Sequence, residues 1–521
     1  MDRFYTPLSQ ADPIGQKELR RLKLFINGQW VDSASGVFRD AFNPSTGNVI
    51  AKVPACTTEE MDAAVAAAKT AYPSWSDTPV HKRCQVLFNM RHLVNDHKDE
   101  LIELLSVEQG KTWPEAAGDV LKALEVIDFA CGMPQLMKGE SLMNVSKGYD
   151  TVLYRESMGV FLGLVPWNFP AMIPHGWMIP LCIASGNTFV LKAASSAPQS
   201  ALRFTELWRE AGLPDGVLNV VTCNAADVSH LINHPDIVGV SFVGSTSVGE
   251  KVYAEAAAAG KRVQCLGEAK NHALVLNDAV LDRTAAGIIN AFCGCAGERC
   301  MALPVIVAQE GIADALVQKL VEKAKELRMG PAWDRADTTL GPLVNARHKE
   351  SVLKWIETGL EEGAVMVLDG RKPSVAPGCE NGFFVGPTIL DHVKPGMSVG
   401  EREVFGPVLC IKRVKTFEEG LAIMNANPYA NGSVIYTSSG YYARQFARYT
   451  DGGQVGVNVG IPVPVCCFGF TGHKRSFIGD LHVMGSDGVR FYTESKNVTS
   501  TWFLPDHQGT VDTWDGMLSL H

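Results

Sequence analysis

The stretch "VGVSFVGSTSVGEKV", residues 238–252, has the pattern of a strand, a tight turn and a helix. Apolar residues come first, the small residues Gly244, Ser245, Thr246 and Gly249 cluster where the helix begins, and the helix follows. Backbone N–H groups at such a helix start, together with the helix dipole, suit a pyrophosphate. The spacing differs from G-x-G-x-x-G, so the turn fits equally well a simple connection between a strand and a helix.

The same alternation of apolar and helical stretches continues on both sides of residues 238–252. It predicts a parallel sheet with helices on both faces, and dinucleotides bind such sheets at the carboxyl ends of the strands. A second alternation begins near residue 281, so we expect an α/β protein with two doubly wound domains. The expected strands are 159–165, 188–192, 217–222, 238–243 and 262–266, then 304–308, 384–390 and 408–413, with helices near 198–211, 246–258, 311–327 and 345–362.

Local signals earlier in the chain predict single elements. Asn27-Gly28 between two apolar runs indicates a hairpin with a type I′ turn, and Thr57 with Glu60 matches a helix capping box. Residues 80–130 look mostly helical. The stretch 157–191 lacks Asp, Glu, Lys and Arg, which is also typical of a membrane span. Its four prolines instead favour a buried strand, turn, helix and strand, and no membrane association.

Composition excludes several classes of protein. The net charge is −9 over 521 residues, and no basic stripe is visible, so nucleic-acid binding is not expected. The 13 cysteines are scattered and odd in number, which indicates a reducing compartment rather than a disulfide scaffold. The N-terminus has no apolar signal core, so secretion is not expected.

Two polar residues stand out against apolar surroundings. Lys192 ends the predicted strand 188–192, where it is either a solvated surface lysine or a ligand of a cofactor hydroxyl or phosphate. Asn168 lies between two prolines in "PWNFP", residues 166–170. A buried amide needs partners, so Asn168 either caps a turn or aims a rigid N–H donor at a developing oxyanion.

Three cysteines fall within "FCGCAGERCMA", residues 292–302. Zinc prefers four ligands in two spaced pairs, and a redox pair is normally C-x-x-C, so neither a metal site nor a redox centre fits well. Arg299 beside Cys300 would favour its thiolate, which makes Cys300 the best nucleophile candidate. Cys293 and Cys295 are then expected to be small packing residues. The adjacent pair Cys466-Cys467 is expected to be buried.

The motifs "PWNFP", "GSTSVG", "GERC" and "EVFGPV" (403–408) occur in the order and spacing seen in the aldehyde dehydrogenase superfamily, which the chain resembles over residues 20–503. The runs "RVQCLGEAKNHALVLNDA" and "GERCMAL" look like those of the CoA-acylating methylmalonate-semialdehyde dehydrogenases. Hydrolytic relatives usually carry a glutamate in an "ELGGK"-like run, and Leu266 stands at that position here. The resemblance therefore favours the CoA-dependent branch.

The resemblance implies a role for each matching residue. Cys300 would attack the aldehyde carbonyl, and Asn168 with the Cys300 backbone N–H would stabilise the oxyanion. Arg299 and Lys122 would recognise a substrate carboxylate. Hydride would pass to NAD, and the acyl group on Cys300 would lose CO₂ and move to CoA, giving propanoyl-CoA or acetyl-CoA. Lys192 is implied to bind the adenosine ribose of NAD, and Glu403 the nicotinamide ribose. The pyrophosphate would lie at Gly244, Ser245 and Gly249. Ser195, Phe405 and Trp167 are further residues implied to bind the cofactor.

Four positions depart from the family pattern. Lys122 replaces an arginine in "GDVLKA", which keeps the charge but loses bidentate recognition of a carboxylate. Glu298 stands where glutamine is usual and, if ionised, would oppose formation of the Cys300 thiolate. Glu268 stands where glycine is expected, about 6–7 Å along an extended chain from the missing base, too far to replace it. Ser195 replaces a glutamate that often selects NAD, although NAD remains the expected cofactor.

The resemblance also implies an organisation and an assembly. A Rossmann-like NAD-binding domain would comprise 20–142 and 159–280, and a catalytic domain 281–483, while 143–158 and 484–503 would be the strands of a homotetramer. Residues 1–19 and 504–521 would be terminal extensions. Relatives occur in bacterial cytoplasm and in the mitochondrial matrix. Two alternatives stay open: a hydrolytic aldehyde dehydrogenase acting on another small aldehyde, and an impaired homologue kept for binding or assembly.

Overall fold

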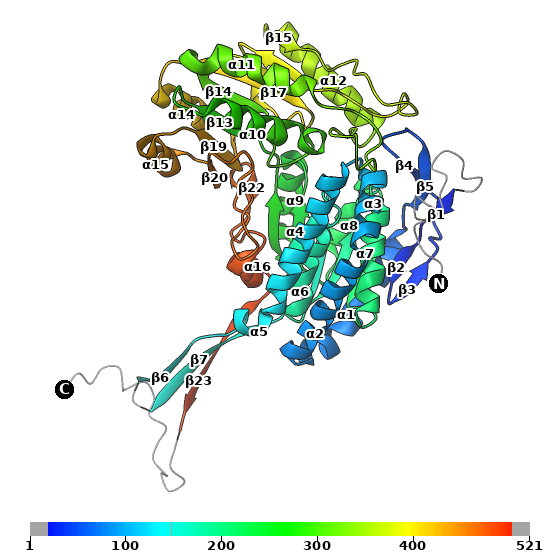
Figure 1. The fold of residues 1–521 in the computed structure, drawn as a ribbon. Coiled ribbons are helices and arrows are strands. Elements are labelled where there is room, and N and C mark those ends of the chain that lie inside the picture. The colour runs from blue at the N-terminus through cyan, green and yellow to red at the C-terminus, as the bar shows by residue number, and fades with distance from the viewer. Residues whose placement is uncertain (1–18, 147, 503–521) are drawn as a thin grey trace, which may run out of the picture.

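An eight-stranded sheet forms the lower lobe in Figure 1. The computed structural model describes residues 19–146 and 148–502. The five central strands run parallel, and they match the five strands predicted first from the sequence. In sheet order the strands are β22 (Phe477–Ile478), β12 (Arg262–Leu266), β11 (Ile237–Val243), β8 (Val160–Leu164), β9 (Thr188–Lys192), β10 (Leu218–Val221), β2 (Leu24–Ile26) and β3 (Gln29–Val31).

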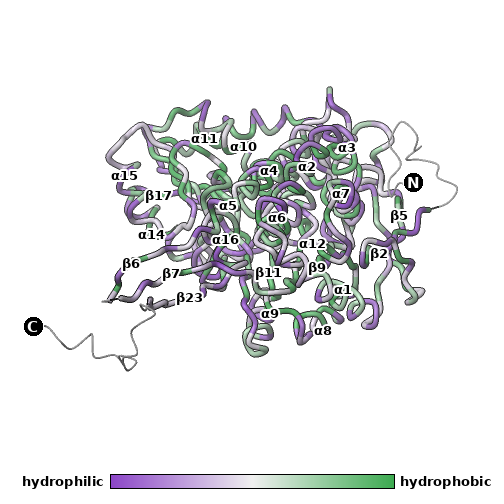
Figure 2. Tube along the Cα trace, turned by 90° about the horizontal axis from the view of Figure 1, so that it is seen from below, coloured by the Kyte–Doolittle hydropathy of each residue, from purple (hydrophilic) through white to green (hydrophobic). Residues whose placement is uncertain are grey.

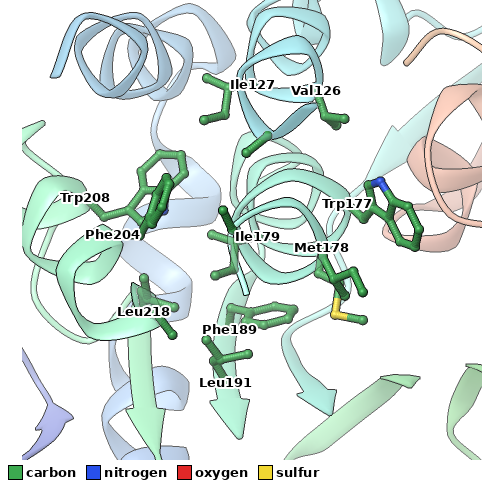
Figure 3. Close-up of a cluster of buried hydrophobic side chains, with 14 of the residues drawn as sticks. Val126, Ile127, Trp177, Met178, Ile179, Phe189, Leu191, Phe204, Trp208 and Leu218 are labelled. Carbon is green, nitrogen blue, oxygen red and sulfur yellow. The ribbon is translucent and has the colours of Figure 1, made fainter. Parts of the chain in front are cut away.

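Helices cover both faces of this sheet, because alternate strand residues enter two different cores. Phe189 and Leu191 of β9 join one hydrophobic cluster, while Val190 between them joins another. Figure 3 shows the first core, where Trp177, Phe204 and other large side chains surround Phe189 and Leu191. Helices α2 (Val80–Asp96), α3 (Lys98–Gln109), α4 (Trp113–Cys131), α6 (Ile179–Ala184) and α7 (Pro198–Glu210) contribute to the first core, and α1 (Thr58–Asp77), α8 (Val228–Asn233) and α9 (Thr246–Ala258) to the second.

A seven-stranded sheet forms the upper lobe in Figure 1. The strand expected at 384–390 begins only at Thr388, because Pro387 has no N–H to donate and the first ladder bond is Thr388 N–H to the Pro407 carbonyl. The strands are β15 (Val365–Leu368), β16 (Thr388–Asp391), β17 (Val408–Val414), β14 (Val305–Gln309), β13 (His272–Val275), β19 (Gly432–Tyr436) and β20 (Gln454–Val457). The helices are α10 (Leu281–Cys293), α11 (Glu310–Lys325), α12 (Ala346–Glu361), α13 (Ser398–Glu401), α14 (Phe417–Ala426) and α15 (Gly440–Tyr449).

A three-stranded antiparallel arm projects from the side of the lower lobe (Figures 1 and 2). It consists of β6 (Ser141–Ser146), β7 (Tyr149–Glu156) and β23 (Glu494–Thr501), and α5 (Met133–Leu136) and α16 (Gly485–Phe491) lie near its base. The arm exposes Met143, which is 81% accessible. The smaller sheets are β1 (Arg20–Arg21), β5 (Val49–Pro54) and β4 (Phe38–Phe42), and β18 (Tyr429–Ala430) with β21 (His473–Lys474). Except for residue 19, the two predicted terminal extensions lie outside the described residues.

Several local predictions are confirmed. Asn27 and Gly28 have φ angles of 50° and 74°, and Ile26 pairs with Gln29, as a type I′ hairpin requires. Thr57 and Glu60 form the predicted capping box at the start of α1. The uncharged stretch 157–191 folds as β8, a turn, the π-helical segment Ile173–Met178, α6 and β9. Among the described residues, no helix is long and apolar enough to cross a membrane.

Candidate active site

The carboxyl ends of four parallel strands meet at one edge of the eight-stranded sheet. β8 lies between β9 and β11: the chain runs from β8 to β9 and β10 on one side, then crosses to β11 and β12 on the other. Such a reversal opens a crevice where open α/β sheets bind ligands. The "PWNFP" loop follows β8, Lys192 ends β9, the Gly244–Ser245 turn follows β11 and Leu266 ends β12. The fold therefore brings predicted site residues from four motifs to the same edge.

The turn after β11 has the features of an anion site. Helix α9 begins at Thr246 with Ser245 as its N-cap, and the Ser245 side chain makes no capping hydrogen bond. The first N–H groups of a helix have no partners within the helix. A Cβ on Gly249 would lie 3.2 Å from the Phe242 ring, so the absence of a side chain allows the helix to pack closely on β11. These features fit a pyrophosphate, and the assignment stays a prediction.

Lys192 presents an amine that is unpaired within residues 19–146 and 148–502. Burial lowers its pKa, and no hydrogen bond or ion pair joins its Nζ to any of the residues that the structure describes. A buried polar group without a protein partner is suited to a ligand hydroxyl or phosphate. Ser195 is half-buried on the segment that leaves β9. The residues present therefore fit the adenosine end of a dinucleotide.

The cysteine loop has a left-handed backbone and close packing. Cys295, Ala296 and Gly297 have φ angles of 51°, 52° and 77°. A Cβ on Gly297 would lie 2.2 Å from the Gly406 carbonyl oxygen, so this glycine allows the loop to touch the 403–408 segment. The Cys300 carbonyl accepts hydrogen bonds from the side-chain amide of Asn271 at 2.8 Å and from that of Asn431 at 3.1 Å. The loop is thus fixed at the upper sheet.

The Cys300 thiol is protonated at rest. Burial, followed by the charge of Glu403, raises its pKa to about 12, although the backbone N–H groups of Cys300 and Met301 and the charge of Arg299 lower it. Arg299 favours the thiolate, as expected, but burial outweighs its charge. The guanidinium lies 3.2 Å from the Cys295 sulfur and 3.7 Å from the Glu115 carboxylate. A nucleophilic role for Cys300 requires a proton acceptor when substrate binds.

Of the other cysteines singled out in the sequence, two are buried packing residues and two are not. Cys293 and Cys295 are 4% and 3% exposed, as expected for packing residues, and Cys295 also accepts the hydrogen bond from Arg299. The expectation for Cys466-Cys467 is wrong, because Cys467 is exposed and Cys466 is half-buried. Within residues 19–146 and 148–502, no group of three or more His, Cys, Asp or Glu side chains could hold a metal ion.

Asn168 lies beside the cysteine loop and is 4% exposed. Its amide Nδ2 donates to the Glu298 carbonyl at 3.1 Å, which leaves a second N–H of the same amide for another acceptor. Below it, Lys111 donates to the Asn168 carbonyl, forms a 2.7 Å ion pair with Asp119 and lies 3.8 Å from the centre of the Phe169 ring. Lys111 and Asp119 are functional candidates that the sequence analysis missed, since no local pattern links them to residue 168.

Glu298 is fully buried between three segments. Its Oε1 accepts the Val344 N–H at 2.9 Å, and its Oε2 accepts the Gln109 side-chain N–H at 3.1 Å. Burial is the main cause that raises the pKa of Glu298 well above its usual value. A neutral carboxyl places no charge near Cys300. The raised pKa therefore weakens the expected opposition of Glu298 to formation of the Cys300 thiolate.

The 403–408 segment carries an aromatic cluster. Phe405 has a left-handed backbone with φ of 58°, and its ring centre lies 5.6 Å from that of Trp167. His348, which the sequence analysis missed, lies 2.7 Å from the Phe405 carbonyl and stacks edge-on against Trp167. Strained φ values of this kind gather at functional sites. The structure thus joins two of the residues that the resemblance places at the cofactor.

Glu403 faces a cavity of about 590 Å³ that Glu268, Arg402 and Tyr429 also line. Its Oε1 accepts the Ala269 N–H at 3.0 Å, and burial, helped by the charge of Glu268, raises its pKa to about 8. The Glu268 carboxylate accepts a 3.1 Å hydrogen bond from the Tyr429 hydroxyl. Leu266 is 5% exposed and belongs to the apolar cluster against which Cys300 packs. No carboxylate therefore stands at the end of β12 itself.

Both expected substrate cations already have acidic neighbours. Lys122 donates to Glu125 at 2.8 Å on the same helix, and Arg299 lies near Glu115. The Lys122 pair is about one-third exposed, whereas the Arg299 pair is more buried. Among the described residues, no hydrogen bond or ion pair joins Lys122 to Arg299.

Comparison with known proteins agrees with this geometry. The model of the aldehyde dehydrogenase family matches residues 30–498. The chain belongs to the aldehyde dehydrogenase family. It is 48% identical to malonate-semialdehyde dehydrogenase 2 of Geobacillus kaustophilus (strain HTA426) over 484 residues, 93% of this chain and 99% of that protein.

Two solved structures of the family superimpose closely on this one. A putative methylmalonate-semialdehyde dehydrogenase from Sinorhizobium meliloti 1021, complexed with NAD, is 42% identical and gives a TM-score of 0.92, covering 94% of this chain and 99% of the other. Methylmalonate-semialdehyde dehydrogenase from Oceanimonas doudoroffii is 42% identical with a TM-score of 0.91, covering 93% and 99%. The predicted family and the aldehyde dehydrogenase fold are thus confirmed, and the chain is an oxidoreductase of this family.

Proposed function

We propose that this protein catalyses the NAD-dependent, CoA-acylating oxidation of methylmalonate semialdehyde or malonate semialdehyde, with loss of CO₂, to propanoyl-CoA or acetyl-CoA. The observation that carries the proposal is Leu266, a buried apolar residue at the end of β12 and the position where the hydrolytic relatives carry their base. The names of the similar proteins support the choice of substrate. They are malonate- and methylmalonate-semialdehyde dehydrogenases.

In the first step the Cys300 thiol gives its proton to a water molecule and the sulfur attacks the aldehyde carbon, so that a carbon–sulfur bond forms while the carbonyl π pair moves to the oxygen and makes it an oxyanion. The free N–H of the Asn168 amide and the Cys300 backbone N–H are the proposed donors to that oxygen. Lys111, Asp119 and the Glu298 carbonyl hold the Asn168 loop and amide in place. Preorganised donors of this kind account for about 3–4 kcal/mol of barrier lowering.

Collapse of the oxyanion then leaves a thioester on Cys300. When bound, NAD supplies the hydride acceptor for this oxidation. Lys192 would hold the adenosine ribose, the Gly244–Ser245 turn with Gly249 the pyrophosphate, and Glu403 the nicotinamide ribose, while Ser195 leaves room near the adenosine end. Phe405 and Trp167 would line one side of the site that holds the nicotinamide ring.

The second half of the reaction releases the acyl group. The carboxylate of the acyl group leaves as CO₂ and the α-carbon to which it was bonded takes up a proton, after which the CoA thiolate attacks the thioester carbon and the Cys300 sulfur departs as a thiolate. General-base activation of water is worth about 10²–10⁴-fold, and the apolar Leu266 supplies none. A CoA thiol is partly ionised near neutral pH and more nucleophilic, so it outcompetes water.

Recognition of the substrate carboxylate is assigned to Arg299, with Lys122 as a second cation. The 3.7 Å distance between Arg299 and Glu115 is longer than a close ion pair, so the guanidinium can also serve a substrate carboxylate. Lys122 would have to share its charge with Glu125. We expect Arg299→Lys to raise KM for the semialdehyde more than Lys122→Ala does.

A coupled assay of NADH formation tests the proposal. The purified protein is given NAD and malonate semialdehyde, with and without CoA, and NADH turnover that requires CoA is the expected result. Cys300→Ala should abolish the NADH burst, whereas Cys295→Ala, at a buried sulfur of the same loop, should keep it. Turnover indifferent to CoA would instead favour the hydrolytic alternative, and no burst at all an impaired homologue.

We also propose a homotetramer in which the arm of β6, β7 and β23 pairs with other copies. The exposed apolar side chains of the arm, Leu142 at 60% and Met143 at 81%, support this assignment. Sedimentation of the wild-type protein and of Met143→Asp at equal concentrations tests it. A smaller assembly is expected for the variant.

A further inference from the structure

Glu298 connects three segments that are far apart in the sequence. Its carboxyl oxygens accept the Val344 N–H and the Gln109 side-chain N–H, and its backbone carbonyl accepts the Asn168 amide. Cys300 follows two residues later. One buried residue thus connects the end of α3, the segment before α12 and the "PWNFP" loop with the loop that carries Cys300.

Among the residues that the structure describes, no cation is free to balance a charge on Glu298. His348 Nε2 lies 3.7 Å from Oε1, but it faces the Phe405 carbonyl at 2.7 Å, and burial lowers the pKa of His348. Lys111 is paired with Asp119 at 2.7 Å. Arg299 is directed at Cys295 and Glu115, and Glu115 adds a second negative charge nearby. A carboxylate at position 298 would therefore be buried without an ion-pair partner, which proteins avoid.

A neutral acid has one O–H to donate, and the pocket holds an acceptor for it. The Gln109 Oε1 is buried and has no hydrogen-bond partner among the described residues. Turning the Gln109 amide by a half-turn brings this oxygen to the Glu298 carboxyl. In that arrangement the protonated acid donates to Gln109 and still accepts from Val344.

We propose that Glu298 is a positioning residue that works as a neutral carboxylic acid and holds the oxyanion donor Asn168 against the Cys300 loop. The inference rests on the roles of Asn168 and Cys300 in the proposed function. A glutamine has the same planar shape and no charge, so Glu298→Gln should preserve the contacts. Glu298→Ala removes both side-chain contacts and leaves the Gln109 amide and the Val344 N–H unpaired.

Protonation also links Glu298 to stability. Because burial raises its pKa in the folded state, the folded protein binds a proton that the unfolded chain releases above about pH 4.3. Stability is therefore lost as pH rises above that value, up to the pKa in the folded protein. Glu298→Gln removes this loss. The melting temperature of the variant minus that of the wild type should grow between pH 5 and pH 8.

The experiment compares the full-length wild type with Glu298→Gln, Glu298→Ala and, as a control for loss of one carboxylate, Glu350→Gln at an exposed glutamate of α12. The melting-temperature difference is expected to increase with pH for Glu298→Gln and to stay flat for Glu350→Gln. In steady-state kinetics Glu298→Gln should keep kcat within about twofold, while Glu298→Ala lowers kcat by about 10–10²-fold with little change in KM for NAD.

Two results would overturn the inference. One is a melting-temperature difference for Glu298→Gln that is constant or shrinks with pH, which means that the folded protein holds a carboxylate. The other is a loss of kcat in Glu298→Gln as large as that in Glu298→Ala. If CoA-dependent turnover is absent but the temperature difference grows with pH, the proposed function fails while the neutral acid stands.

Discussion

Replacing Lys111 by methionine tests how the oxyanion donor is held. The Lys111 ammonium and the Asp119 carboxylate both have fully buried side chains, and their 2.7 Å ion pair lies under the Asn168 loop. Removing one partner of such a pair leaves an uncompensated buried charge, which costs about 3–5 kcal/mol of stability. The contact of Lys111 with the Phe169 ring, at 3.8 Å, is lost as well. We therefore expect a loss near the upper end of that range.

The effect on catalysis should be separable from the effect on NAD binding. Asp119 still accepts the Met172 N–H at 2.7 Å, so one anchor of the loop remains in Lys111→Met. A misplacement of Asn168 by about 1 Å would lower kcat by about 10²-fold. Lys192 ends β9 and α9 follows β11, whereas the loop of Asn168 follows β8. KM for NAD should therefore change little.

The assay is urea unfolding at fixed protein concentration, together with kcat at saturating substrates. The double variant Lys111→Met with Asp119→Leu removes both charges and should recover most of the lost stability but not kcat. If Lys111→Met unfolds at the wild-type urea concentration and keeps kcat within about twofold, the buried pair does not support the oxyanion site and the reasoning is refuted.

Four further predictions follow from single contacts. Asn168→Ala should lower kcat by about 10²–10³-fold while the rate of Cys300 alkylation stays unchanged, and slowed alkylation would point to a disturbed loop instead. Leu266→Glu should increase free-acid formation without CoA, measured by chromatography; an unchanged product ratio would mean that the missing base does not set the acceptor. Gly297→Ala should lower the melting temperature, since its Cβ would lie 2.2 Å from the Gly406 oxygen at a φ of 77°, and an unchanged value would contradict that close packing. Burial raises the pKa of Glu403 to about 8, so its carboxyl is mostly protonated at pH 7 and ionised at pH 9. NAD should therefore bind more tightly at pH 9 than at pH 7, measured by calorimetry, and Glu403→Gln should lose this pH dependence.

Short-range patterns in the sequence determined most of the secondary structure at the site edge. The run 238–252 predicts β11, the turn and α9, because strand periodicity, small turn residues and helix formers follow one another within a few residues. The Asn27-Gly28 hairpin and the capping box at Thr57 depend on neighbours only. The strand at 384–390 was placed too early because its pairing with β17 sets where it begins.

The residue types of the proposed chemistry were also visible in the sequence, and with them the family. Their electrostatic states were not. The same Arg299 that suggests a thiolate at Cys300 faces Cys295 in the fold, and the burial of Cys300 raises its pKa to about 12. The pKa of a side chain depends on what packs around it, and adjacency in the chain does not give that environment.

The sequence by itself determined that a cysteine, an asparagine and a dinucleotide-type turn occur on an α/β chain. Only the tertiary structure decided how they are held. Gln109 meets Glu298 across 189 positions and Lys111 meets Asn168 across 57, contacts that no local pattern encodes. Burial at that meeting point raises the pKa of Glu298, because desolvation favours the protonated acid over a carboxylate, and the sequence alone does not show that burial.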